Sequence, residues 1–149
     1  MTVPLLLHGH AQHVHACEWN PNSVLAIREN LRRTGVSDRC TVYEGDNKIS
    51  SVHLDSLADR VLLGLLPSSV TGWPLAARAL KSSGGTIHVH ENVLESILDS
   101  FVEETRIKFE DMLQQLGKNL RVSVVHVERV KSYAPRVYHV VVDLKCEKV

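Results

Sequence analysis

Residues 121–144, RVSVVHVERVKSYAPRVYHVVVDL, decide the fold of this chain. They contain two β-branched runs, Arg121–Arg129 and Val137–Leu144, which are typical of strands. The joint between them, Val130–Arg136, includes Tyr133-Ala134-Pro135 and is too short to hold a crossover helix. The two runs therefore predict an antiparallel hairpin near the C-terminal end of the chain.

Upstream of this hairpin, strand patterns and helix patterns alternate, which indicates a parallel sheet covered by helices. The expected strands are Val14–Glu18, Cys40–Glu44, Asp59–Leu66 and Thr86–His90. The expected helices run from Asn20-Pro21 to a stop at Gly35, over Thr71–Ser82, and from about Leu94 to a stop at Gly117. The sequence also predicts a turn at Gly45-Asp46-Asn47. Because Asp59–Leu66 is nearly all apolar, we expect that strand to be buried on both faces.

A parallel α/β sheet closed by an antiparallel hairpin is typical of the class I methyltransferase-like fold, a Rossmann-like architecture. In that fold the strand order is 3-2-1-4-5-7-6, and here the first strand is missing, because Met1–Gly9 predicts only a few helical residues. Val14–Glu18 and Asp59–Leu65 would then flank a gap. Either they pair with each other or the sheet is split.

Composition narrows the class of protein further. A length of 149 residues, 44% of them hydrophobic, predicts a single domain over residues 1–149. Seventeen basic residues balance seventeen acidic ones, which excludes capture of nucleic acid by bulk charge alone. No apolar run approaches the roughly 20 residues of a membrane span, so we expect no membrane partner. The three cysteines form no CxxC pair, which excludes a zinc ribbon and predicts free thiols in the cytoplasm.

Acidic residues follow two neighbouring strands of the expected sheet. Ligands of open α/β sheets bind outside the carboxyl ends of the strands. Glu18 ends the first visible strand and could accept hydrogen bonds from ribose hydroxyls, while Asp46, beside Asn47, could accept an adenine amino group. The alternatives are a solvated carboxylate favoured by the helix dipole at Glu18 and tight-turn chemistry at Asp46. Together the two acids suit one nucleoside.

Two further candidate segments follow the next two expected strands. Leu66-Pro67-Ser68-Ser69 offers backbone groups and hydroxyls but no acid, base or thiol, and it could equally be a plain strand-to-helix turn. His90-Glu91-Asn92 lies at the carboxyl end of the fourth expected strand, Thr86–His90. We expect Ser68, His90 and Asn92 to contact substrate, and the sequence identifies no catalytic acid–base pair.

Other chemistry has little support in the sequence. Three histidine pairs have a spacing of two, namely His8/His10, His13/His15 and His88/His90. No carboxylate or cysteine completes a ligand set at metal spacing, so no metal site is expected. P-loop, GxGxxG, GxSxG and HExxH motifs are absent from the sequence. Basic residues near the hairpin could touch phosphates or form a solvated face, and they are Arg129, Lys131, Arg136 and Lys145.

Several short runs carry a resemblance to a known family. They are Ala16-Cys17-Glu18-Trp19-Asn20-Pro21, Asn30-Leu31, Gly35-Val36, Asp38-Arg39-Cys40, Gly45-Asp46-Asn47, Asp59-Arg60-Val61, Leu63-Gly64-Leu65, Pro67-Ser68-Ser69, Gly72-Trp73-Pro74, His88-Val89-His90-Glu91-Asn92-Val93 and Val130-Lys131-Ser132-Tyr133-Ala134-Pro135. Together they closely resemble the tRNA wybutosine-synthesizing protein 2 family, over about residues 2–145. That family comprises aminocarboxypropyltransferases related to the enzymes that N1-methylate guanosine 37 of tRNA.

The resemblance implies a class I methyltransferase fold that binds S-adenosylmethionine. It implies transfer of the 3-amino-3-carboxypropyl group to C7 of 4-demethylwyosine at position 37 of tRNA(Phe), with methylthioadenosine as by-product. Glu18 matches the ribose-binding acid, and Asp46 and Asn47 match the adenine-side pair. Trp19 and Pro67 belong to the matching runs and are expected beside the cofactor.

Two features of the sequence bear on this implied activity. The methylating relatives carry an Asn-Pro-Pro type motif where this chain has Leu65-Leu66-Pro67-Ser68, which favours aminocarboxypropyl transfer. The alternatives are N1-methylation of guanosine 37 and a non-catalytic fragment of such an enzyme. Family members also carry an acidic, glycine-rich first motif and a preceding tRNA-binding region. Because the resemblance begins after that motif, we expect an N-terminally truncated domain.

Overall fold

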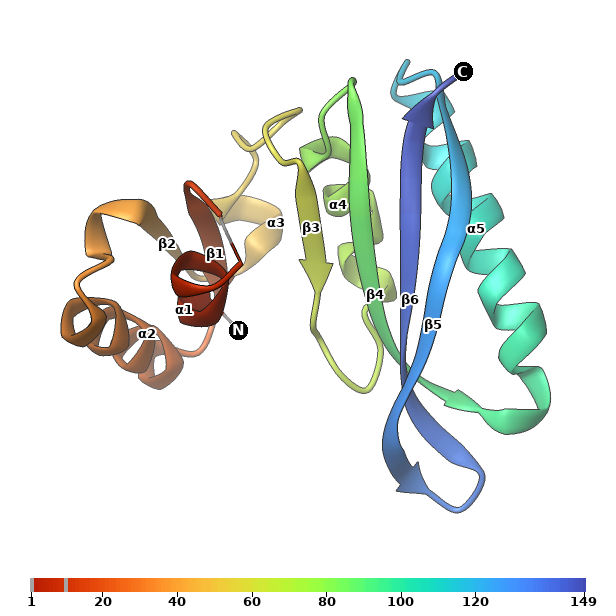
Figure 1. The fold of residues 1–149 in the computed structure, drawn as a ribbon, viewed down its shortest axis with the longest axis horizontal. Helices are drawn as coiled ribbons and strands as arrows, with labels where there is room; N and C mark the ends of the chain where they lie inside the picture. Colours follow the sequence, from red (N-terminus) through yellow and green to blue (C-terminus); the bar gives the residue numbers. More distant parts are fainter. Residues whose placement is uncertain (1, 10) are drawn as a thin grey trace. The chain divides into compact units, whose positions relative to one another are not determined.

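The computed structural model describes residues 2–9 and 11–149, which form two compact units (Figure 1). The first unit extends to His53 and the second runs from Leu54 to Val149. The expectation of one domain over the whole chain stays a prediction.

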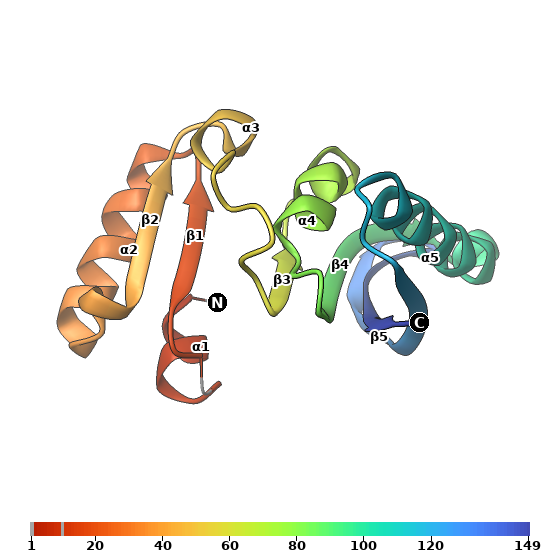
Figure 2. The same ribbon diagram turned by 90° about the horizontal axis from the view of Figure 1, so that it is seen from above.

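The first unit is a small parallel sheet with a helix on one face. Strands β1 (Val14–Glu18) and β2 (Cys40–Glu44) pair in parallel, in register from Val14↔Cys40 to Glu18↔Glu44. Helix α2 (Pro21–Thr34) covers one face of this sheet (Figure 2), and a short helix α1 (Thr2–Leu7) adds Leu6 to the same core. Both strands have the predicted bounds.

Local sequence signals set the ends of α2. The Asn20 side chain accepts a hydrogen bond from the Asn22 backbone N–H at 3.0 Å, and Pro21 occupies the first turn, where a missing N–H costs nothing. Gly35 ends the helix with φ 68°, a left-handed conformation that glycine adopts without strain. The predicted start and stop are both confirmed.

Two short helices of the first unit were not expected from the sequence. After β2, Gly45 turns with φ 105° and the next residues form α3 (Asn47–Ser50), so the predicted turn leads into a helical turn. A 3-10 turn, η1 (Ser37–Arg39), precedes β2. Both elements are too short to produce a periodic pattern that the sequence could reveal.

The second unit is a mixed sheet of four strands. They are β3 (Arg60–Leu63), β4 (Gly84–Leu94), β5 (Leu120–Ala134) and β6 (Val137–Lys148). The order is β3-β4-β6-β5, with β3 and β4 parallel and the other two pairs antiparallel. The last strand therefore lies between its two predecessors, as the class I methyltransferase-like order requires. The hairpin is confirmed, and the strands form two sheets, β1-β2 and β3-β4-β6-β5.

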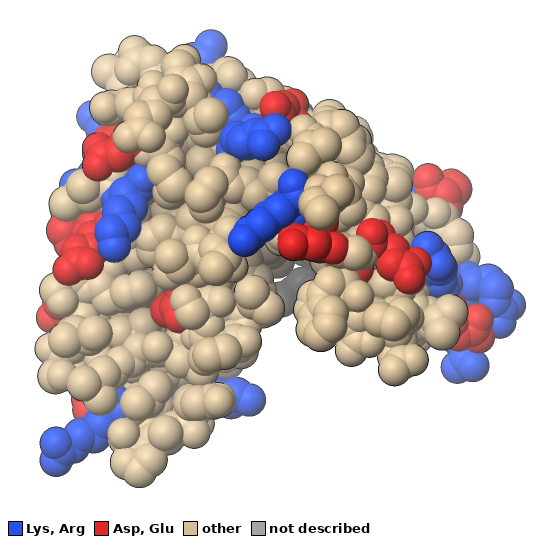
Figure 3. Space-filling model, turned by 180° about the vertical axis from the view of Figure 1, so that it is seen from behind, with Lys and Arg blue, Asp and Glu red and all other residues tan. Residues whose placement is uncertain are grey.

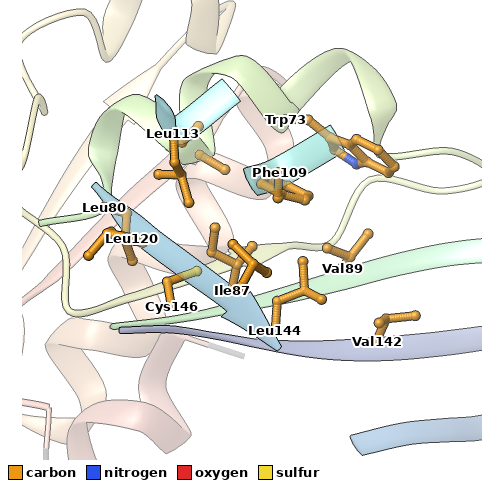
Figure 4. Packing of buried hydrophobic residues seen from close by; sticks show 13 residues of the cluster. Trp73, Leu80, Ile87, Val89, Phe109, Leu113, Leu120, Val142, Leu144 and Cys146 are labelled. Atoms are coloured by element: carbon orange, nitrogen blue, oxygen red, sulfur yellow. The ribbon is translucent and has the colours of Figure 1, made fainter. Parts of the chain in front are cut away.

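Helices α4 (Trp73–Ala79) and α5 (Leu98–Gln115) cover one face of the second sheet (Figure 2). Short 3-10 turns, η2 (Val70–Gly72) and η3 (Glu95–Ile97), lead into them. Buried apolar side chains from both helices and the sheet form the main core, where the rings of Trp73 and Phe109 lie 5.1 Å apart (Figure 4). Both helices are shorter than predicted, because Leu80 is extended and Leu94 still belongs to a strand.

Two strand predictions were wrong. Asp59–Leu66 forms a strand only at Arg60–Leu63, and its residues are exposed or half-buried rather than buried on both faces. The reason is that β3 is an edge strand, paired only with β4 among the described residues. In contrast, β4 continues beyond His90 to Leu94, because β6 pairs with it as far as Leu94↔Val137 after the pairing with β3 ends at Leu63↔Val89.

Two close contacts hold the start of β4 and the end of α4. Gly84 has φ 98°, and a Cβ atom there would lie 2.4 Å from the Cys146 carbonyl oxygen of β6. The Lys118 side chain, 6% exposed, donates hydrogen bonds to the carbonyl oxygens of Ala77 at 2.8 Å, Arg78 at 2.6 Å, and Leu80. Lys118 thus satisfies carbonyl groups that the end of α4 would leave without intrahelical partners.

Candidate functional site

In the first unit, the carboxyl ends of β1 and β2 hold the predicted acids. Glu18 and Glu44 are the last register pair, and the Gly45 N–H donates to the Glu18 carbonyl oxygen at 3.0 Å, which ties the two following loops together. The Glu18 side chain is half-buried, and its Oε1 accepts from the Asn20 N–H at 2.9 Å. Trp19 lies between them in sequence with 69% of its surface exposed.

Asp46 and Asn47 follow directly on the neighbouring strand. Asp46 is exposed, and its Oδ1 accepts from the Lys48 N–H at 2.9 Å, which makes it the N-cap of α3. Asn47 begins that helix, and its carbonyl oxygen accepts from the Ser51 N–H at 3.2 Å. Both acids therefore have a local structural role. A carboxylate has about four acceptor positions, so each also keeps capacity for a ligand hydroxyl or amino group.

In the second unit, the loop after β3 is fastened to β4 by a buried carboxylate. Glu91, 7% exposed, accepts from the Ser68 hydroxyl and from the Ser69 N–H, both at 3.0 Å. The Pro67 carbonyl oxygen, after a cis Leu66–Pro67 peptide bond, accepts from the Asn92 N–H at 3.0 Å. The Trp73 indole in turn donates to the Ser69 hydroxyl at 3.1 Å. These hydrogen bonds hold the loop against β4.

Polar side chains line the face of the second sheet that points away from α4 and α5. Side chains alternate along a strand, so the burial of Ile87 and Val89 in the helix-side core places His88, His90 and Asn92 on the opposite face. On β6, His139 and Asp143 share that face by the same alternation.

Two contacts join these polar side chains across the strands. His88 Nδ1 lies 2.6 Å from Asp143 Oδ1. His90 Nδ1 lies 3.0 Å from His139 Nε2. Asn92 is the register partner of His139 and lies beside this pair.

The hydrogen bonds of Pro67 and Ser68 attach this loop to β4, but they do not bring the Ser68 side chain together with those of His90 and Asn92. The Ser68 hydroxyl bonds to Glu91, which alternation places on the helix side of the sheet, whereas His90 and Asn92 are on the opposite face. The structure also corrects the prediction for His90-Glu91-Asn92, which lies within β4 instead of at its end. Sequence reasoning assigned no role to Glu91 and missed His139. Alternation along Val137–Leu144, with valines buried at 140 and 142, is the signal that could have placed His139 beside the β4 histidines.

Burial lowers the pKa of His90, and the neighbouring His139 and His88 lower it further, while Asp143 acts in the opposite direction. Because this pKa is lowered, His90 binds a proton less readily in the folded state than in the unfolded chain, where a histidine titrates near pH 6.5. The unfolded state then holds more protons, so stability rises with pH and falls as pH drops below about 6.5. The pKa of His15 is lowered in the same direction by burial, His13 and His53.

We therefore expect the free energy of unfolding, measured by urea denaturation between about pH 7.5 and 5.5, to decrease on acidification. His90→Gln should reduce this slope, and His15 should account for part of what remains. His126→Gln, at an exposed position, is the matched control for replacing an imidazole with an amide. A stability that rises on acidification would contradict the assignment.

No group of three or more His, Cys, Asp or Glu side chains within residues 2–9 and 11–149 could hold a metal ion. His13 and His15 lie with ring centroids 4.8 Å apart, and the His10 half of the pair with His8 lies outside the described residues. None of the described helices is long and apolar enough to cross a membrane.

The surface charge is mixed. On the face shown in Figure 3, acidic and basic side chains lie close to one another. Arg129, one of the basic residues near the hairpin, is 3.1 Å from Glu95 and lies over the ring of Tyr138 at 5.2 Å. Because Glu95 compensates part of the Arg129 charge, this geometry favours a structural role of Arg129 over phosphate contact.

Comparison with known proteins identifies the family. The model of the TRM5/TYW2 methyltransferase domain matches residues 1–125. The chain belongs to the TRM5/TYW2 methyltransferase family. A relative of this family from Danio rerio, tRNA wybutosine-synthesizing protein 2 homolog, is 41% identical over 98% of this chain. The alignment covers 43% of that relative, so the chain spans less than half of its length.

Solved structures of the family agree in fold. M. jannaschii TYW2 in complex with AdoMet has a TM-score of 0.84 and 29% identity, covering 99% of this chain and 64% of that one. P. horikoshii TYW2 in complex with MeSAdo has a TM-score of 0.82 and 31% identity, covering 99% of this chain and 52% of that one. The class I methyltransferase-like fold expected from the sequence is therefore confirmed.

Proposed function

We propose that the chain contributes to an S-adenosylmethionine-dependent tRNA aminocarboxypropyltransferase of wybutosine biosynthesis. The reaction would place the 3-amino-3-carboxypropyl group on C7 of 4-demethylwyosine at position 37 of tRNA(Phe), in the cytoplasm. The observation that carries the proposal is the 41% identity to a tRNA wybutosine-synthesizing protein 2 homolog over 98% of this chain. The AdoMet and MeSAdo complexes of TYW2 structures support a sulfonium donor.

The chemistry suits a site with no acid–base pair. The base carbon C7 attacks the γ-carbon of the donor, the γ-carbon–sulfur bond breaks, and C7 then releases its proton to solvent water. Sulfur leaves as the neutral thioether methylthioadenosine, which needs no proton to depart. Because the sulfonium activates three carbons alike, the carbon placed next to the nucleophile decides the product. Rigid positioning is then the main task of the protein, and the Pro67–Ser69 loop fastened to Glu91 offers such a surface.

The first unit would hold the nucleoside end of the donor. Glu18 would accept hydrogen bonds from the ribose hydroxyls, and Asp46 with Asn47 would bind adenine. Trp19, which follows Glu18 and is exposed, would contact the donor as well. In the second unit, Pro67 would contact the donor, while Ser68, His90 and Asn92 would contact the tRNA base. The tRNA is the only macromolecular partner in the proposal.

A double-label experiment tests the reaction. A full-length version of the protein is incubated with tRNA(Phe) carrying 4-demethylwyosine and with S-adenosylmethionine labelled differently on its methyl and aminocarboxypropyl carbons. We expect the aminocarboxypropyl label in the tRNA and methylthioadenosine in solution. Entry of the methyl label alone would indicate a methyltransferase instead. No transfer and no binding of the donor would indicate a non-catalytic fragment.

Variants of the strand-end acids test donor binding. Glu18→Gln and Asp46→Asn keep an acceptor oxygen for the Asn20 and Lys48 backbone N–H groups but remove the charge. We expect each to weaken S-adenosylmethionine binding about tenfold, because a hydrogen bond to a charged group contributes about 1.5–3 kcal/mol. Isothermal titration calorimetry measures the change. Glu44→Gln, on the same sheet end but paired with Arg28, is the control that should bind normally.

A further inference from the structure

Three buried polar atoms have no hydrogen-bond partner on the face of the second sheet that points away from α4 and α5. They are Asn92 Nδ2, Asn92 Oδ1 and His139 Nδ1, and none has a hydrogen bond among the described residues. Asn92 and His139 are direct register partners on β4 and β6, so the three atoms belong to one place. Folded proteins rarely leave buried polar atoms unpaired, because the lost contacts with water are not replaced.

The hydrogen bond between the two histidines fixes what His139 can offer. One ring nitrogen of the His90–His139 pair, 3.0 Å apart, must donate and the other must accept. If His139 Nε2 accepts, its proton sits on Nδ1, which becomes a free donor. If Nε2 donates, Nδ1 is a free acceptor. Either way His139 Nδ1 can bond one polar atom of a ligand, beside an amide that supplies both a donor and an acceptor.

The charge of the cluster restricts the class of ligand. Burial and the adjacent histidines lower the pKa of His90, which favours its uncharged imidazole. Asp143, a carboxylate in contact with this row, is hydrogen-bonded to His88 at 2.6 Å. A charged ammonium or carboxylate would gain little from such neutral groups. A neutral, planar edge with a donor next to an acceptor matches them well, which is the pattern of a nucleobase.

We propose that Asn92 and His139, with His90 behind them, form a recognition site for the hydrogen-bonding edge of a purine-type base. His139 is the specificity-determining residue that the sequence did not reveal. The site deepens the proposed function, since a base of the tRNA is the natural source of that edge. It does not depend on donor binding, and so it can be tested without S-adenosylmethionine.

The probe is guanosine 5′-monophosphate, added to the 149-residue chain with ¹⁵N-labelled histidine. We expect the ring signals of His139 and His90 to shift saturably, while those of His126 on β5 stay in place. Ribose 5-phosphate is the control that carries no base, and it should move none of these signals. Unmoved signals with the nucleotide, or equal shifts with both compounds, would overturn the proposal, whatever the outcome of the transferase assay.

Apolar variants separate a binding site from a structural network held by water. Asn92→Leu removes two unpaired atoms and no hydrogen bond of the side chain, so it should melt at the same or a higher temperature than the parent chain. His139→Phe also removes the hydrogen bond to His90, so only its nucleotide binding is diagnostic. Both variants should bind the nucleotide about tenfold more weakly or worse. His126→Gln should change neither property. A lower melting temperature of Asn92→Leu would show that its amide holds the fold through water, and would overturn the proposal.

Discussion

Gly84→Ala is expected to lower the free energy of unfolding by about 3–5 kcal/mol. Two costs combine at this position. A left-handed backbone at φ 98° strains any residue with a Cβ atom, and that atom would lie 2.4 Å from the Cys146 carbonyl oxygen. Backbone cannot move aside as a flexible side chain would, so β4 and β6 must separate at their first register pair, Gly84↔Glu147. Urea denaturation measures the loss.

Gly117 provides the matched control for this prediction. It also has a positive φ, 71°, but a Cβ atom there would meet nothing within 4 Å. Gly117→Ala should therefore cost only the conformational term, about 1–2 kcal/mol. Equal losses for the two variants would show that the close approach of β6 contributes nothing.

Lys118→Ala is expected to destabilise the chain by about 3 kcal/mol. The substitution leaves the carbonyl oxygens of Ala77, Arg78 and Leu80 without their shared donor and opens a space at the end of α4. Hydrogen bonds to a charged group contribute about 1.5–3 kcal/mol, and a buried acceptor left unpaired costs about as much. The expected loss would be seen as an earlier midpoint in urea denaturation.

An exposed lysine of α5 shows whether this effect is specific. Lys108 lies 3.8 Å from Glu104, and its side chain is 61% exposed. Lys108→Ala should change the free energy of unfolding by less than about 0.5 kcal/mol, since surface ion pairs contribute little. A loss at Lys118 no larger than the loss at Lys108 would remove the capping role.

The parts of the fold that sequence reasoning predicted are those governed by local signals. Asn20-Pro21 and Gly35 mark the ends of α2, and the β-branched runs on either side of Tyr133-Ala134-Pro135 mark the hairpin. These signals act through backbone geometry within a few residues, so they need no knowledge of tertiary contacts.

The parts that could not be predicted depend on distant partners. The apolar pattern of β4 ends at Glu91, yet the strand continues, because that carboxylate is buried with the Ser68 hydroxyl and the Ser69 N–H as partners. Similarly, nothing near His139 in the sequence shows that Asn92 lies opposite it. His90 and Asn92 were predicted at the end of the fourth strand but lie within β4, and the contact of His90 with His139 is set by the register of β6.

The irregular pairing of β5 has a consequence for how the protein behaves at high concentration. As the edge strand of its sheet, β5 presents free backbone groups along one side, which is a template for aggregation. Its register shifts between Val124 and His126, between Arg129 and Lys131, and between Ser132 and Ala134. Such bulges bend and twist the strand, so an approaching strand would find only short stretches of regular backbone. The bulges thereby protect this edge against the edge-to-edge strand pairing that produces insoluble protein.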